Sequence, residues 1–251
     1  MARENLSDLS PLYKYQEGME WNPVEKVILE RRSIRAFKKD PLPDSLLRRI
    51  LEAGRFAPSA GNAQPWKFVV VKNPEILDAI ERETRKIAKL LMWFLDYDRN
   101  WFTRIFLKPY TKFMIRVMPN SLHPVPFSLL KRIAEGEAPA YHGAPTLILM
   151  MMDKRGVSCP ELDLGIAGQN MVLSAHSMGA GTCWIGMLQV LMYIPKWRKF
   201  FGVKYPYELN VCIGVGWPKG QLDGLVPREV QLVEWYDGGI NDKPRVERQG
   251  E

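Results

Sequence analysis

Two apolar runs constrain the fold of this chain more than any other feature of its sequence. Residues 67–72 read KFVVVK and residues 146–152 read TLILMMM, and each run follows turn-forming residues. Short continuous apolar runs of this kind are typical of strands that are covered on both faces. We therefore expect residues 67–72 and 146–152 to be buried strands. Shorter apolar runs predict two further strands, at residues 182–185 and 209–215.

Stretches with helical spacing separate these strands. Asn22 and Pro23 are typical of a helix N-cap and of the first helical position, so residues 24–31 are predicted to be helical. Further helices are expected after Pro43-Asp44, from Asn73-Pro74 onward and over residues 160–178. The last of these is apolar almost all round, which indicates a helix buried on most sides. This alternation indicates an α/β or α+β domain whose sheet lies between helical layers.

Cysteine and histidine usage argues against several classes of site. Cys159, Cys183 and Cys212 are far apart and form no CxxC pair, and the three histidines lack metal-ligand spacing. We therefore expect no metal site and no disulfide framework, and the pattern favours a reducing cytoplasm. Residues 1–18 are polar and do not resemble a secretory signal. The longest candidate membrane stretch, residues 90–95, is far shorter than the roughly 20 residues that a span needs.

The positive charge of the chain is concentrated in one segment, residues 85–135. The segment holds ten lysines and arginines against three acidic residues, an excess that equals the net charge of +7 of the whole chain. It also holds nine of the chain's 27 aromatic residues. Three hypotheses account for it: helical packing with a solvated basic face, a lid over an apolar or anionic substrate, or an amphipathic surface for peripheral contact with anionic membrane. Nucleic-acid binding is disfavoured because no recognised module accompanies the charge.

The first motif that could carry chemistry is the run Arg31-Arg32-Ser33-Ile34-Arg35, at the end of a predicted helix. Three guanidinium groups and a hydroxyl within five residues form a strong candidate anion site, because arginine can bind phosphate through two parallel hydrogen bonds. The alternative is a solvated helix end whose cations complement the helix dipole.

Two further motifs lie in loops. Residues 57–66 read APSAGNAQPW, where small residues let a ligand approach the backbone. Asn62 and Gln64 offer paired donors and acceptors for the edge of a heteroaromatic ring, although an ordinary helix-to-strand loop is the alternative. Residues 179–186 read GAGTCWIG, which superficially resembles a dinucleotide fingerprint. Trp184 stands where the third glycine should be, and the run follows a helix, so a Rossmann site is excluded.

Together with the sequence DLGIAGQNM at residues 163–171, these motifs resemble the nitroreductase-like FMN family in their order and spacing. The resemblance covers roughly residues 24–82 and 140–235. It implies an α+β sandwich with a central, mostly antiparallel sheet flanked by helices. It also implies an entwined homodimer that binds FMN in two clefts at the subunit interface. The chain would then be a single nitroreductase-like domain over residues 1–251, with a variable, lid-like insertion at about residues 85–135.

The resemblance implies roles for the arginine-rich motif. Arg31 matches a phosphate-binding arginine, and Arg32 and Ser33 match contacts to the phosphate and the pyrimidine edge of FMN. Arg35 stands where the family places a cation near flavin N1 and O2, and positive charge there favours the negatively charged reduced flavin. Arg228 matches a phosphate-binding arginine near the C-terminus.

Two loops complete the implied cofactor site. The loop contributed by the other subunit comprises Pro58, Ser59, Asn62 and Gln64. The stretch beside the flavin, where a backbone N–H faces N5, comprises Cys183, Trp184, Ile185 and Gly186. No catalytic side chain is identified, because the flavin carries the chemistry. The side chains of Cys183 and Trp184 are interpreted as packing, and His142 is either a proton donor or a structural residue.

The implied activity is that of an FMN-dependent NAD(P)H oxidoreductase. In a ping-pong scheme, NAD(P)H would deliver hydride to the flavin and leave the cleft. A small oxidised acceptor (a nitroaromatic, a quinone or an activated alkene) would then take the electrons in the same cleft. Two alternatives stay open: a specialised relative of the dehalogenase or dehydrogenase kind, and a non-catalytic flavin or electron-carrier protein at a membrane surface.

Overall fold

The computed structural model describes residues 21–95, 101–117, 124–220, 228 and 231–249. These residues belong to two compact units, residues 33–219 and residues 1–32 together with 220–251, and each unit is described by itself. The single domain over residues 1–251 stays a prediction.

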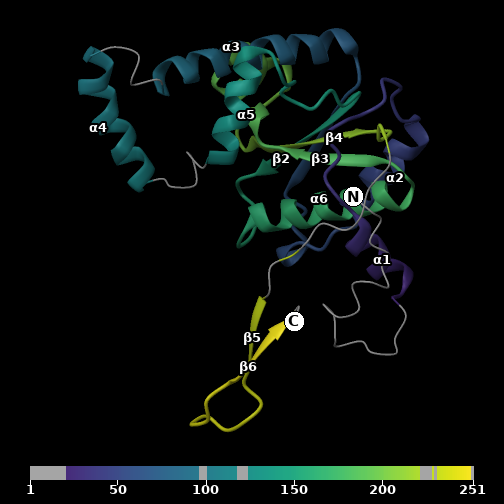
Figure 1. The fold of residues 1–251 in the computed structure, drawn as a ribbon. Coiled ribbons are helices and arrows are strands. Elements are labelled where there is room, and N and C mark those ends of the chain that lie inside the picture. Colours follow the sequence, from purple (N-terminus) through teal and green to yellow (C-terminus); the bar gives the residue numbers. More distant parts are fainter. Residues whose placement is uncertain (1–20, 96–100, 118–123, 221–227, 229–230, 250–251) are drawn as a thin grey trace. The chain divides into compact units, whose positions relative to one another are not determined.

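A four-stranded antiparallel sheet forms the centre of the larger unit (Figure 1). Its strands, in spatial order, are β1 (Trp66–Val71), β2 (Thr146–Asp153), β4 (Tyr207–Gly216) and β3 (Gly181–Ile185). β2 pairs with β1 on one side and with β4 on the other, and β3 pairs with the far side of β4. The four predicted strands are therefore present, and the expected α+β class with an antiparallel sheet is confirmed.

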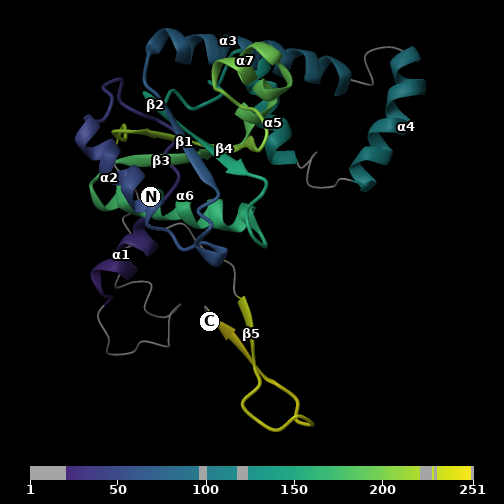
Figure 2. The ribbon, with the colours of Figure 1, turned by 180° about the vertical axis from the view of Figure 1, so that it is seen from behind.

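Helices cover both faces of this sheet (Figures 1 and 2). Against one face lie α2 (Asp44–Arg55) and α6 (Pro160–Ser177). Against the other lie α3 (Pro74–Leu95), the 3-10 helix η5 (Met187–Tyr193) and α7 (Pro195–Phe200). α5 (Pro124–Glu135) packs beside α3. The sheet between helical layers that the sequence predicts is confirmed.

The central strand β2 shows how one apolar run supplies two cores. Its side chains alternate between the faces: Leu147 and Leu149 join the buried cluster with α3 and η5, whereas Ile148 and Met150 join the cluster with α2 and α6. All four are at most 1% exposed. A strand covered on both faces needs apolar residues at every position, which explains the run TLILMMM.

β1 differs from this expectation. It lies at the edge of the sheet, where Val71 is its one fully buried residue and Val70 is 37% exposed. The prediction for residues 67–72 is therefore right in type and wrong in burial. The apolar run marks a strand, but the pairing order decides which strand is central.

Sequence spacing does not predict η5, α7 or the helices of the basic segment. There, α3 continues to Leu95, and α4 (Trp101–Val117) and α5 follow. No helix in the described part of the chain combines the length and the apolar character that crossing a membrane would require.

The smaller unit contains α1 (Pro23–Glu30) and the hairpin of β5 (Gln231–Trp235) and β6 (Arg245–Gln249). The predicted N-cap of α1 is confirmed. The Asn22 side chain accepts hydrogen bonds from the N–H groups of Val24 and Glu25, at 2.9 and 3.0 Å. In return, the Glu25 carboxylate accepts from the Asn22 N–H at 2.7 Å, which completes a capping box.

Candidate functional site

The loop between α2 and β1 brings three predicted site residues together. The Ser59 hydroxyl accepts a hydrogen bond from the Gln64 N–H at 2.9 Å, and the Gln64 side-chain amide donates to Asn62 Oδ1 at 3.0 Å. Gly61, Asn62 and Gln64 all have positive φ, between 48° and 58°. Glycine and asparagine tolerate this left-handed region best, which accounts for the sequence GN in the short helix η3 (Ala60–Asn62).

A buried carboxylate anchors this loop to α6. Asp163 is 5% exposed, and both of its carboxylate oxygens lie 3.3 Å from the N–H of Ala60, which donates to them. Asp163 stands in the first turn of α6, where a negative charge also complements the helix dipole. The bond to Ala60 spans 103 residues, so no local pattern could reveal it.

The second predicted motif is held beside β3. Ser33 forms a parallel bridge with Thr182, and the Ile34 N–H donates to the Thr182 carbonyl at 2.8 Å. Ile34 is buried, and its side chain occupies the space where Gly181 would carry a Cβ. Residue 33 onward is therefore fixed to the strand that carries Cys183.

Arg35 connects this motif electrostatically to β3 and to His142. Burial raises the pKa of the Cys183 thiol, and the Arg35 guanidinium acts against that shift. Burial also lowers the pKa of His142, and Arg35 lowers it further. Arg35 is itself exposed. The structure thus groups a cation, a half-buried imidazole and a buried thiol, an arrangement that favours an anion or a developing negative charge.

The strand β3 divides the GTCWI side chains between the two faces of the sheet. Cys183 and Ile185 are buried on the α3 face. Trp184 packs on the opposite face, where a Cβ on Gly168 of α6 would lie 2.1 Å from the indole Cη2. The indole is therefore committed to packing, as the sequence predicts.

Gly186 ends β3 with an open backbone. Nothing lies within 4 Å of the position where it would carry a Cβ, and the residue is exposed. Its carbonyl accepts a hydrogen bond from the Gln189 N–H at 3.1 Å, which starts η5. A flat ligand can approach this backbone without meeting a side chain.

Three predicted cofactor contacts lie in the smaller unit. Arg31 is the C-cap of α1, and its N–H donates to the Val27 carbonyl at 3.1 Å. The Nε of Arg31 is buried and has no hydrogen-bond partner among the described residues. Buried donors are normally satisfied, so this guanidinium fits an external acceptor such as a phosphate oxygen. Arg32 lies next to it, and Arg228 is exposed; their cofactor roles stay predictions.

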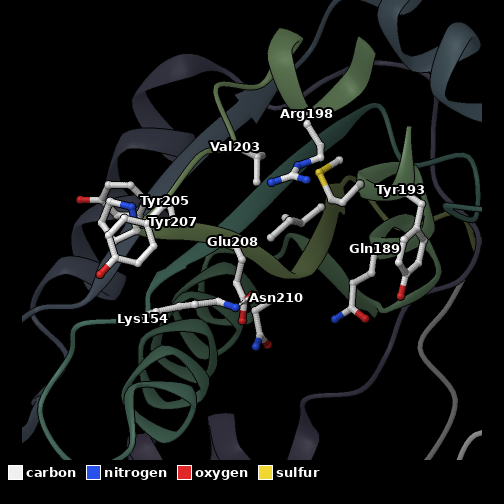
Figure 3. Close-up of a pocket in the computed structure, with 12 residues that line it drawn as sticks. Lys154, Gln189, Tyr193, Arg198, Val203, Tyr205, Tyr207, Glu208 and Asn210 are labelled. Carbon is white, nitrogen blue, oxygen red and sulfur yellow. Dashed lines mark ion pairs between the residues drawn. The ribbon is translucent and has the colours of Figure 1, made fainter. Parts of the chain in front are cut away.

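A cavity of about 550 Å³ opens beside η5, and sequence reasoning missed it (Figure 3). Its lining includes Lys154, Gln189, Tyr193, Arg198, Glu208 and Asn210. Lys154 and Glu208 form an ion pair at one side, and Arg198 points toward the middle. The lining residues come from the turn after β2, from η5, α7 and β4, and from the connection between α7 and β4, and no motif joins these segments in the sequence. Elsewhere in the described residues, no three acidic, histidine or cysteine side chains are placed to hold a metal ion.

Comparisons with known proteins agree with these features. The model of the nitroreductase family matches residues 28–217. YfhC of Bacillus subtilis (strain 168), which carries the provisional name NAD(P)H nitroreductase, is 38% identical over 196 residues, 78% of this chain and 84% of its own. Nitrobenzene nitroreductase of Ectopseudomonas oleovorans is 27% identical over 165 residues, 64% of this chain and 72% of its own.

A solved structure agrees as well. A nitroreductase with bound FMN from Desulfitobacterium hafniense DCB-2 matches with a TM-score of 0.62 and 25% identity, over 83% of this chain and 96% of its own.

Proposed function

Because this chain belongs to the nitroreductase family, we propose that it is an FMN-dependent oxidoreductase that takes electrons from NAD(P)H and passes them to a small oxidised acceptor. Two relatives support this class: YfhC by its provisional name and the Ectopseudomonas oleovorans enzyme by its activity on nitrobenzene. The FMN in the Desulfitobacterium hafniense structure supports the choice of cofactor.

The residues of this chain fit such a cofactor. Arg31 and Arg32 would hold the phosphate, and the orphaned Nε of Arg31 is a donor in need of an acceptor. Ser33 and Arg35 would face the pyrimidine edge, and the open backbone at Gly186 would face the ring. When bound, FMN supplies the hydride and electron transfer. The chain's own task is to position the ring and to keep positive charge beside it.

The observation that carries the proposal is the placement of Arg35. Its positive charge acts on both Cys183 of β3 and His142, in addition to the larger effect of burial on each group. A cation beside the flavin would stabilise negative charge that develops during reduction.

The donor and the acceptor would occupy the same cleft in turn, which gives ping-pong kinetics. The acceptor classes that we propose are nitroaromatics, quinones and activated alkenes.

We propose a homodimer in which the loop from Pro58 to Gln64 reaches the flavin of the partner subunit. The outer face of α6 supports this. Leu162 is 61% exposed, and nothing lies within 4 Å of the Cβ position of Gly165. An apolar helix face with a small residue allows close approach of a second helix.

The test is FMN content and flavin reduction. We expect the double variant Arg31→Ala, Arg35→Ala to lose most of its bound FMN, whereas Arg48→Ala, Arg49→Ala, which removes two exposed arginines of α2, keeps it. Anaerobic mixing of the wild-type holoprotein with NADH or NADPH should bleach the flavin. Full flavin content in the first variant would show that the phosphate site is misplaced, and no bleaching with either donor would contradict the enzyme class.

A further inference from the structure

Helix α4 presents large apolar side chains to solvent. Trp101 is 74% exposed, and Phe106, Tyr110 and Phe113 are each 60–61% exposed. Contiguous apolar surface of this kind is unusual in a soluble monomer and normally marks an interaction site. The hypothesis that this segment only packs within the domain therefore fails for the described side chains of α4.

Nine described residues of α4 form two rows along the helix. One row is apolar and recurs every fourth residue: Trp101, Ile105, Pro109, Phe113 and Val117. The second row is basic and also recurs every fourth residue: Arg104, Lys108, Lys112 and Arg116. Residues four apart are neighbours on a helix and are offset by about 40°, so the two rows wind around the axis side by side, with about 100° between adjacent members such as Arg104 and Ile105. The helix contains no acidic residue.

This pattern distinguishes between the surfaces that could cover α4. A symmetric contact with a second copy would bring the basic row of one chain toward that of the other, and like charges repel. A small substrate would cover only part of a helix that is about 25 Å long. An anionic bilayer accepts the apolar row at the acyl boundary and the basic row among its phosphate groups.

We propose that α4 is a membrane-surface helix that binds this protein to anionic lipid bilayers. The helix lies in the interface, with the apolar row inserted and the four cations facing phosphate headgroups. The exposed Trp93 near the end of α3 adds an aromatic ring of the type enriched at such interfaces. The positive charge of α4 disfavours contact with the α4 of a second copy, and it favours an anionic surface.

Vesicle flotation with the intact holoprotein tests the proposal. We expect the protein to float with phosphatidylcholine vesicles that contain phosphatidylglycerol, at low salt, and to float weakly with phosphatidylcholine alone. The variant Lys108→Glu, Lys112→Glu, Arg116→Glu should weaken binding by on the order of a hundredfold. The variant Trp101→Ser, Ile105→Ser, Phe113→Ser, in the apolar row, should weaken it by at least about tenfold.

Matched controls change the same kinds of side chain elsewhere. Lys196→Glu, Lys199→Glu, Lys204→Glu reverses three exposed lysines outside α4, and Leu232→Ser, Ile240→Ser removes exposed apolar groups of the smaller unit. Both controls should float like the wild type. FMN content and melting temperature verify that every variant is folded.

Three results would overturn the proposal. The first is absence of flotation with either vesicle, and the second is an equal loss of binding in the control and α4 variants. The third is an α4 variant that floats normally but becomes monomeric in light scattering or loses affinity for the acceptor. That outcome would assign α4 to a second copy or to a substrate lid. None of these results bears on flavin reduction, which is measured without vesicles.

Discussion

Asp163 is the residue on which the geometry of the 58–64 loop depends most directly. Its carboxylate is buried and accepts a hydrogen bond from the backbone N–H of Ala60. Removing an acceptor from a buried donor costs about 1–3 kcal/mol, because the donor loses its partner without regaining water. The loop carries four predicted cofactor contacts, so a disordered loop should also weaken FMN binding.

We expect Asp163→Ala to lower the free energy of unfolding by about 1–3 kcal/mol and to weaken FMN binding. Asp163→Asn keeps an oxygen acceptor, so it should lose less stability and less FMN affinity than Asp163→Ala. Glu161→Ala, an exposed acid in the same turn of α6, is the control. Urea unfolding and FMN titration by fluorescence measure the two effects. Equal losses in Asp163→Ala and Glu161→Ala would refute the anchoring role.

Burial is the main cause of the pKa shifts of His142 and Cys183, and Arg35 adds a second contribution to each. Its charge disfavours protonated His142 and favours the Cys183 thiolate. We therefore expect Arg35→Ala to raise the pKa of His142 toward its ordinary value of 6.5, and to raise the pKa of Cys183 further. An NMR titration of the His142 imidazole measures the first shift, with Arg48→Ala as the control. An unchanged pKa of His142 would show that Arg35 does not act on this imidazole.

The same shift has a consequence for stability. The pKa of His142 is lower in the folded than in the unfolded chain, so its contribution is fully present above pH 6.5 and is lost as the pH falls through the folded pKa. Between about pH 8 and about pH 5, the wild type should thus lose more stability than either Arg35→Ala or His142→Gln. Urea unfolding at both pH values measures the difference.

Among the elements, β4 contains an irregularity that shapes both the core and the cavity. Val211 pairs with Met150 and Leu209 with Met151, so Asn210 is an extra residue in the strand. In a regular strand, Leu209 and Val211 are two residues apart and would share one face. Instead, Leu209 joins the core with α3, and Val211 packs against the core with α6. The extra residue lines the cavity (Figure 3), and bulges commonly re-aim a side chain near a site.

This pairing predicts unequal effects of two deletions in the same strand. Deleting Asn210 leaves every remaining pair on its present face and should cost about 1–3 kcal/mol. Deleting Ile213 shifts the residues on one side of it to the opposite faces, which buries the wrong side chains and should prevent folding. Thermal unfolding followed by circular dichroism compares the two. Equal tolerance of both deletions would contradict the assigned bulge.

At the scale of the whole molecule, the proposed dimer makes the cofactor site depend on the partner subunit. Leu162→Arg places a charge on the outer face of α6, where burial against a second helix would be costly. We expect this variant to become monomeric in light scattering and to lose FMN together with the dimer. Ile240→Arg, at a fully exposed position of the smaller unit, should do neither. A Leu162→Arg protein that stays dimeric would exclude this face as the interface.

The candidate flavin site was predictable from the sequence, whereas the cavity beside η5 was not. The four motifs, in their order, identify the family that the comparisons show. The bridge of Ser33 to Thr182, beside Cys183, comes from the structure and not from the motifs. The cavity beside η5 was missed because its lining comes from four elements that no motif joins.

Local pattern determined the type of most elements of this protein. Strand runs, helix periods and the Asn22 cap are short-range features, since they record which side of a segment meets the core and which backbone groups need partners. The sequence by itself therefore determined the four strands of the sheet, the helices α1, α2, α3 and α6, and the candidate flavin-binding motifs.

Tertiary structure alone decided where those elements meet. It placed β1 at the sheet edge, turned Leu209 away from Val211, seated Trp184 on Gly168 and joined Asp163 to Ala60. It also packed the end of α3 against α5 and left the apolar row of α4 exposed. Each of these depends on contacts between residues far apart in the chain, which a local pattern does not record.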